Sequence, residues 1–157
     1  TPREGSAFRI TFPAAAEPAP APPPAAAHEG ATVLVVDDEE MVRRVAKATL
    51  EANGWRVLLA NDGLAAIEQV REHSEIGLIL LDLTMPVMNG EEALDQILEA
   101  RPGVKVVVST GYGNREATAR FGTSRVAGFL QKPYTARQLA ETVRTVSGAG
   151  QARSHAD

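Results

Sequence analysis

The chain has 157 residues, of which 44% are hydrophobic and 23% are charged, and its formal net charge is −4. This balance is typical of one soluble globular domain with flanking segments, and the negative charge provides no general attraction to nucleic acid or to anionic lipid. Because the chain has no cysteine, a disulfide framework, a thiolate metal site and a cysteine nucleophile are excluded.

The first 30 residues differ in composition from the rest. Seven of the ten prolines fall within the first 24 residues, and we interpret residues 14–30 as a Pro/Ala-rich linker, because such chain is extended and has little bulky apolar surface. Before the linker, Phe8, Ile10 and Phe12 alternate with polar residues as in a half-buried strand. An isolated strand is not stable, so residues 1–13 are predicted to be the tail of a preceding domain. Their pattern resembles the last strand of the ATP-binding domain of sensor histidine kinases.

No segment predicts insertion into a membrane. The longest apolar runs, such as Ile76 to Leu81, are too short to span a bilayer. The N-terminus also lacks a basic segment followed by an apolar one. We therefore expect a cytoplasmic location and no membrane contact by this chain.

From residue 31 to 147, strand-like apolar runs alternate with segments of helical periodicity, and residues 148–157 are predicted to be a flexible tail. The expected strands are Thr32 to Val36, Arg56 to Ala60, Ile76 to Leu81, Val104 to Val108 and Ala127 to Leu130. Runs that do not alternate with polar residues indicate parallel strands buried on both faces. With right-handed crossovers, the predicted fold is α/β: a doubly wound five-stranded parallel sheet of the flavodoxin-like order 2-1-3-4-5.

The helix ends carry their own signals. An N-cap with a reciprocal acceptor three residues later is expected at Asn89 with Glu92 and at Thr135 with Gln138. Gly54 suits a left-handed stop at the end of a helix. The segment Asn114 to Arg125 is expected to be helical although Gly122 interrupts it.

Polar residues follow four of the five expected strands, at the edge where doubly wound sheets form their binding sites. They are Asp37 and Asp38 after the first strand, Asp82 after the third, Thr110 after the fourth and Lys132 after the fifth. The strand order brings the three carboxylates together, and their mutual repulsion predicts a hard cation such as Mg²⁺. Lys132 and Thr110 suit phosphoryl oxygens, and Asp82 suits an in-line nucleophile for phosphoryl transfer.

Four segments resemble the signature of response regulator receiver domains, over about Ala31 to Ser147. The segments are Val35-Val-Asp-Asp-Glu, Leu80-Leu-Asp-Leu-Thr-Met-Pro-Val-Met-Asn-Gly, Val108-Ser-Thr-Gly-Tyr and Phe129-Leu-Gln-Lys-Pro-Tyr. The resemblance implies that Asp82 is the phosphorylated aspartate and that Asp38 binds Mg²⁺ directly, with Mn²⁺ as a substitute. It also implies that Asp37 acts mainly through bound water and that the backbone carbonyl of Thr84 is a further metal ligand.

The same resemblance assigns the switch. Thr110 and Lys132 would bind the phosphoryl group, and Phe129 would swing inward when the threonine is drawn to the phosphate. The Lys132–Pro133 peptide bond is expected to be cis, which proline allows at small cost.

The resemblance further implies a phosphorelay function. The domain would accept a phosphoryl group from phosphohistidine and catalyse its own aspartate phosphorylation and dephosphorylation. The donor would be the phosphohistidine domain of a histidine kinase, in the same parent chain, or a histidine phosphotransfer protein. The kinase-like residues 1–13 favour the C-terminal receiver of a hybrid sensor histidine kinase; the alternative is a stand-alone single-domain response regulator. A homodimer could form through the helix at Asn114 to Arg125, the strand after it and the last helix, and no nucleic acid contact is expected.

Three other functions compete with this interpretation. An aspartyl phosphatase of the haloacid dehalogenase class also uses Mg²⁺, a threonine and a lysine, but its second aspartate lies two residues after the nucleophile of the first strand, where this chain has Glu39 after Asp37. An FMN-binding flavodoxin-like module would need Ser/Thr-rich phosphate turns, which are not evident. A degenerate receiver that only mediates contacts would be expected to lack some of the five key residues.

Overall fold

The computed structural model describes residues 32–85, 88–122 and 124–148, in which five strands alternate with five helices. The strands are β1 (Thr32–Val36), β2 (Arg56–Ala60), β3 (Ile76–Asp82), β4 (Lys105–Thr110) and β5 (Gly128–Gln131). The helices are α1 (Glu40–Ala52), α2 (Gly63–Glu72), α3 (Gly90–Ala100), α4 (Asn114–Phe121) and α5 (Ala136–Val146). All strand pairs are parallel and the sheet order is β2-β1-β3-β4-β5. The predicted fold class and strand order are confirmed.

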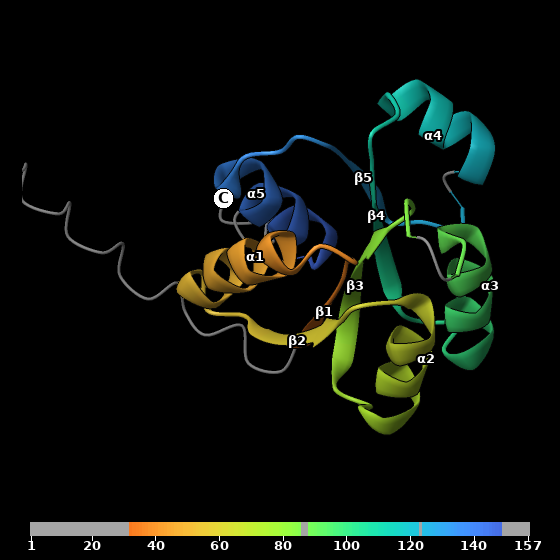
Figure 1. Ribbon diagram of the computed structural model, residues 1–157, viewed down its shortest axis with the longest axis horizontal. Helices are drawn as coiled ribbons and strands as arrows, with labels where there is room; N and C mark the ends of the chain where they lie inside the picture. Colours follow the sequence, from red (N-terminus) through yellow and green to blue (C-terminus); the bar gives the residue numbers. More distant parts are fainter. Residues whose placement is uncertain (1–31, 86–87, 123, 149–157) are drawn as a thin grey trace, which may run out of the picture.

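Two hydrophobic layers enclose the sheet. Helices α1 and α5 cover one face, and α2, α3 and α4 lie on the other (Figure 1). Successive strand residues point to opposite faces: Val33 packs into the α1–α5 layer and Leu34 into the α2–α3 layer, and both are 0% exposed. This burial on both faces explains why the strands are continuous apolar runs in the sequence.

Three strands end later than predicted. They were expected to end at Leu81, Val108 and Leu130, but β3 ends at Asp82, β4 at Thr110 and β5 at Gln131. The ladder includes the pairs Asp82 with Ser109 and Thr110 with Gln131. Polar side chains do not prevent backbone pairing, which the apolar pattern alone does not reveal. Asp82 and Thr110 are consequently part of the sheet, not of loops.

Helix α4 is shorter than predicted. It ends at Phe121 and does not reach Arg125, because Gly122 adopts φ 69° and its N–H bonds the carbonyl of Thr118. A positive φ is easily adopted by glycine. Gly54 after α1 also has a positive φ, of 89°, as predicted.

The two predicted helix caps differ in outcome. Thr135 and Gln138 form the expected reciprocal capping box at the start of α5. Asn89 caps α3, but its side chain accepts from the N–H of Glu91 and no reciprocal bond from Glu92 closes a box. Both helices nevertheless begin where the sequence indicated.

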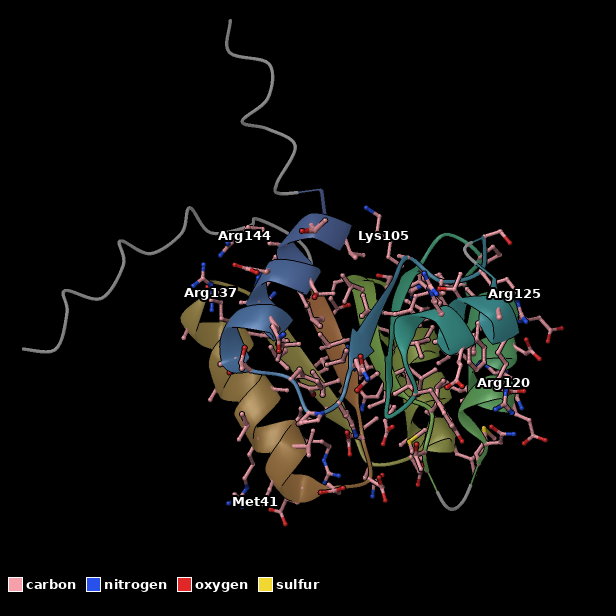
Figure 2. The ribbon with its side chains drawn as sticks, turned by 90° about the horizontal axis from the view of Figure 1, so that it is seen from above. Met41, Lys105, Arg120, Arg125, Arg137 and Arg144 are labelled. Carbon is pink, nitrogen blue, oxygen red and sulfur yellow. The ribbon has the colours of Figure 1, made fainter. Side chains whose placement is uncertain are left out.

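Two ion pairs connect α3 with α4 and the segment that follows it. Arg120 pairs with Glu91 and Arg125 pairs with Asp95. Figure 2 shows both arginines on the side of the molecule that carries α3. All four side chains are partly open to solvent, with exposed fractions of 37% to 61%, so each pair contributes little to stability.

Several predictions fall on residues outside the described ranges. They are the preceding-domain tail at 1–13, the linker at 14–30 and almost all of the flexible tail at 148–157. Within the described residues, no helix combines the length and the hydropathy that crossing a bilayer requires.

Arg101, which follows α3, connects the end of α2 with the start of β3 through hydrogen bonds. Its guanidinium donates to the carbonyl oxygens of Val70 at 2.7 Å, Ile76 at 2.9 Å and His73 at 3.1 Å, and more weakly to Ser74 at 3.4 Å. These carbonyls end α2 and begin β3, where helix geometry leaves acceptors without partners.

Arg101→Ala should lower the free energy of unfolding by about 2 kcal/mol, because several carbonyl oxygens lose a charged donor. Urea unfolding followed by circular dichroism measures the change. Arg115→Ala is the matched control, since Arg115 is an exposed arginine of α4, and it should change stability by less than about 0.5 kcal/mol. Equal losses in the two variants would contradict the role of Arg101.

Candidate functional site

Three carboxylates meet at the carboxyl ends of β1 and β3, which are neighbouring strands. Asp82 is the last residue of β3, and Asp37 and Asp38 directly follow β1. Each of the three offers a carboxylate oxygen within 4.8 Å of the others. Asp37 is 3% exposed and Asp82 is 2% exposed, whereas Asp38 is open to solvent. Hard divalent cations prefer such oxygen donors, so the residues fit a Mg²⁺ ion.

Backbone groups orient the two buried carboxylates. Oδ1 of Asp82 accepts from the N–H of Thr84 at 3.0 Å, and Oδ1 of Asp37 accepts from the N–H of Glu39 at 2.9 Å. The carbonyl oxygen of Asp37 accepts from the guanidinium of Arg43 at 2.6 Å. One oxygen of each of these two carboxylates is thus held by a backbone N–H group, and the other contacts Lys132.

Lys132 bridges the two buried carboxylates. Its Nζ lies 2.8 Å from Oδ2 of Asp37 and 3.2 Å from Oδ2 of Asp82, and 26% of its side chain is exposed. The backbone N–H of Lys132 bonds the carbonyl of Thr110 at 2.8 Å, which ties the lysine to β4. The Lys132–Pro133 bond is cis, as the family resemblance implied.

Burial and neighbouring charges shift the pKa values of Asp82 and Lys132. Burial raises the pKa of the Asp82 carboxyl, although the N–H of Thr84 and the charge of Lys132 act to lower it. Burial acts to lower the pKa of the Lys132 ammonium, but its hydrogen bond to Asp37 and the charges of Asp82 and Asp37 outweigh that effect and raise it. A cation beside Asp82 would favour its ionised form.

The remaining predicted residues lie around this centre. Thr110 is 0% exposed, and its hydroxyl accepts from the N–H of Tyr112 at 3.0 Å. Among the described residues it has no bond to the side chains of Asp82 or Lys132. Phe129 is half-buried against the α2–α3 layer.

Sequence reasoning did not identify Arg43 as a site residue. Arg43 lies in the first turns of α1 and contacts the carbonyl oxygen of Asp37. In the sequence alone, it is indistinguishable from an ordinary charged residue on a helix surface. The six-residue separation from Asp37 is compatible with this contact only once the turn between β1 and α1 is known.

Residues 33–144 match a protein family described as the response regulator receiver domain. The chain belongs to this family. It is 33% identical to the sensor kinase CckA of Brucella abortus over 115 residues, 37% identical to the autoinducer 1 sensor kinase/phosphatase LuxN of Vibrio harveyi over 120, and 29% identical to the chemotaxis protein CheY of Thermotoga maritima over 119. These matches cover 73%, 76% and 75% of this chain.

Solved receiver structures share the fold. A receiver domain from Clostridium thermocellum aligns with a TM-score of 0.69 and 26% identity, covering 78% of this chain and 98% of that one. A CheY-like receiver from Methanospirillum hungatei aligns with a TM-score of 0.68 and 25% identity, covering 77% and 97%. The receiver spans 12% of CckA and 14% of LuxN, but 98% of CheY.

Mg²⁺ should raise the melting temperature of the receiver, because it relieves repulsion among the three carboxylates. At tenfold its Kd the ion would add about 1.4 kcal/mol to the free energy of unfolding. Asp38→Ala should abolish the shift, whereas Glu68→Gln, at an exposed position of α2, should retain it. Scanning calorimetry with Mg²⁺ and with EDTA measures the effect, and an unchanged wild type would count against the site.

Asp82→Asn should raise the free energy of unfolding at pH 7 in Mg²⁺-free buffer. Because the folded pKa of Asp82 is raised, the folded protein binds this proton more tightly than the unfolded chain does. Protonation of Asp82 therefore stabilises the folded state at low pH, and this stabilisation is lost as pH rises through the folded pKa. Asparagine stays neutral, so the gain should shrink as pH falls from the raised folded pKa toward the ordinary aspartate pKa of about 3.9, and it should be smallest below that pH.

Denaturant unfolding between pH 3 and pH 8 measures this difference. Asp95→Asn is the control, because Asp95 is exposed and paired with Arg125; it should give no gain at pH 7. A constant difference between Asp82→Asn and wild type across the pH range would show that burial of the Asp82 charge is not the cause.

Proposed function

We propose that this receiver domain accepts a phosphoryl group from phosphohistidine onto Asp82, with Mg²⁺ bound by the carboxylate cluster. The observation that carries the proposal is the arrangement around one carboxylate: Asp82 has two aspartates on one side and the ammonium of Lys132 at 3.2 Å. Acidic residues for a cation and a cation for phosphoryl oxygens are the elements that phosphoryl transfer requires.

The transfer forms one bond and breaks another. A carboxylate oxygen of Asp82 attacks phosphorus, the P–N bond of phosphohistidine breaks, and the imidazole nitrogen retains the electron pair of that bond. Lys132 neutralises charge on the phosphoryl oxygens, and Asp37 holds the lysine in place through the 2.8 Å contact. Bound Mg²⁺, or Mn²⁺ in its place, supplies further neutralisation of the phosphoryl charge; Asp37, Asp38, Asp82 and the carbonyl of Thr84 would hold it.

We assign the switch to Thr110 and Phe129. A phosphoryl group on Asp82 would offer the Thr110 hydroxyl a charged acceptor, and charge-assisted hydrogen bonds are stronger than neutral ones. Moving toward it would break the present contact with the N–H of Tyr112. Phe129 packs against the α2–α3 layer on the same face of the sheet, and its ring would then follow the threonine inward.

The parent protein is proposed to be a hybrid sensor histidine kinase in the cytoplasm, with a kinase phosphohistidine domain or a histidine phosphotransfer protein as partner. The similarity to segments of the kinases CckA and LuxN supports this context. The similarity to nearly the whole of CheY supports a stand-alone regulator as the alternative. A homodimer through α4, β5 and α5 stays a prediction.

An aspartyl phosphatase is not favoured. Glu39 replaces the second aspartate of that class, and its backbone N–H serves to orient Asp37. Asp82, on the third strand in sequence, is the carboxylate that Lys132 and the aspartates surround. The proposed nucleophile is therefore the carboxylate at the end of the third strand, as in receiver domains.

A groove beside the site offers a place for the donor to dock. It has a volume of about 440 Å³ and is lined by Glu39, Met41, Val42 and Val45 of the α1 side and by Lys132, Pro133 and Tyr134 after β5. Met41 is 66% exposed and Val45 is 54% exposed, and Figure 2 shows Met41 at the N-terminal end of α1. The groove shares Lys132 with the carboxylate site, so a helix that brings phosphohistidine to Asp82 along this groove would bury these side chains.

Incubation with phosphoramidate and Mg²⁺, followed by intact mass measurement, tests the phosphoacceptor. We expect one added phosphoryl group on wild type, none on Asp82→Asn, and none when EDTA replaces Mg²⁺. Asp95→Asn, an exposed aspartate outside the cluster, should be labelled like wild type. Equal labelling of Asp82→Asn and wild type would remove Asp82 from the mechanism.

Docking is tested by comparing a protein donor with a small one. The donor is the kinase core or phosphotransfer protein that phosphorylates wild type fastest in a panel of candidates. Met41→Glu and Val45→Glu should each slow this transfer about tenfold, as interface anchors of about 1.4 kcal/mol do, and leave phosphoramidate labelling unchanged. Leu64→Glu, at an equally exposed position on α2, should transfer normally; an equal loss there would contradict the groove.

A further inference from the structure

Arg43 is an arginine of α1 that contacts the backbone of the acidic site. Its Nη1 donates to the carbonyl oxygen of Asp37 at 2.6 Å, and the residue is partly buried. Hydrogen bonds with a charged donor are shorter and stronger than neutral ones. The contact therefore restrains the chain at the point where it leaves β1 and enters the acidic site.

The neighbouring charged residues of α1 bind in a different way. Arg44 pairs with Glu40 and Lys47 pairs with Glu51, each with an acidic side chain one helical turn away. Exposed pairs of this kind contribute little to stability. Arg43 instead reaches back six residues to a carbonyl oxygen that lies outside the helix. Its placement points to a role at the site and not on the helix surface.

Arg43 completes the set of partners that hold Asp37. The N–H of Asp37 bonds the carbonyl oxygen of Ala60 at 3.3 Å. Its Oδ1 accepts from the N–H of Glu39 at 2.9 Å, and its Oδ2 accepts from Nζ of Lys132 at 2.8 Å. The carbonyl oxygen is the remaining polar group, and Arg43 is its donor. Asp37 is thus held by the sheet, by the lysine and by α1.

The carbonyl oxygen that Arg43 binds belongs to the peptide group between Asp37 and Asp38. Because a peptide group is planar, a restraint on this oxygen also restrains the nitrogen and the Cα atom of Asp38. Asp38 is open to solvent, yet its carboxylate lies within 4.8 Å of the two buried ones. Repulsion from those carboxylates favours rotation of Asp38 toward water, and the restraint on the peptide opposes the backbone movement that would accompany it.

We propose that Arg43 is a positioning residue for the cation: by holding the Asp37–Asp38 peptide group, it keeps the Asp38 carboxylate directed at the ion that the cluster binds. The inference rests on the proposed function, because it takes the cluster as the Mg²⁺ site. Arg43 acts through the peptide group and contacts neither the ion nor the phosphoryl group in this scheme.

The charge of the guanidinium acts in the opposite direction. A positive charge near the cluster repels Mg²⁺ and would by itself weaken its binding, but solvent and salt reduce this repulsion at the open side of the site. Loss of a residue that orients a metal ligand weakens metal binding about 10–100-fold. Positioning should therefore outweigh repulsion. Since the two effects have opposite signs, the direction of the change in Mg²⁺ affinity decides between them.

Isothermal titration calorimetry of the receiver, with Mg²⁺ alone as the probe, measures this affinity. Arg43→Met removes the charged donor and keeps most of the apolar stem, and it should raise the Kd about tenfold, which corresponds to about 1.4 kcal/mol. Arg44→Met is the matched control, because it removes the same charge from the next residue, whose partner is Glu40; it should change the Kd by less than about twofold. An unchanged or lower Kd in Arg43→Met, or an equal rise in Arg44→Met, overturns the proposal.

Labelling kinetics give a second readout. With phosphoramidate, the Mg²⁺ concentration that gives half of the maximal labelling rate should rise in Arg43→Met by the same factor as the Kd. A residue that only supports the fold would lower the maximal rate and leave this concentration unchanged, and that result overturns the proposal. Each variant is compared after cooperative thermal melting shows that it is folded. If Arg43→Met is not folded, Arg43→Ala takes its place, because alanine is the strongest helix former.

Calorimetry also separates this inference from the proposed function. Binding of Mg²⁺ needs no phosphoryl group, so the effect of Arg43→Met on the Kd is measurable even if Asp82 is not the phosphoacceptor. Absence of labelling in a wild type that binds Mg²⁺ would count against the proposed function alone. Absence of Mg²⁺ binding by wild type would overturn both.

Discussion

Repulsion among three clustered carboxylates is the constraint on which the rest of this site depends. Parallel pairing of β1 with β3 places Asp37 beside Asp82, with oxygens that also lie within 4.8 Å of Asp38. Lys132 offsets part of the repulsion by binding both buried side chains, and backbone N–H groups hold their remaining oxygens. The negative charge that remains suits a divalent cation, which in the proposed function would in turn attract a phosphoryl group.

The hydrophobic layers supply the stability that this arrangement costs. Leucines, isoleucines and valines of the central strands are almost completely buried, and each such side chain contributes about 1.5–3 kcal/mol on burial. The strands end in polar residues that still belong to the hydrogen-bonded ladder, as Asp82 and Thr110 do. The acidic cluster is therefore held at the ends of buried, hydrogen-bonded strands, which suits a centre that must keep its geometry when a charged group binds.

The fold was readable from the sequence because doubly buried strands are continuous apolar runs and because the residues after them are polar. The gathering of Asp82 with its two acidic neighbours and Lys132 followed from strand order alone. Arg101 could not be anticipated, since its carbonyl partners lie 25 to 31 residues away. The burial of Ser109 and of the Tyr134 hydroxyl was equally hidden, because burial depends on packing that periodicity does not describe.

Alternation along β4 directs two neighbouring residues to opposite faces of the sheet. Ser109 points toward the layer of α1 and α5, and Thr110 points toward the layer of α2, α3 and α4, against which Phe129 packs. Both residues lie at the end of the strand that pairs with Asp82. A substitution at Ser109 or at Thr110 therefore alters the packing on one face of the sheet and leaves the other face intact.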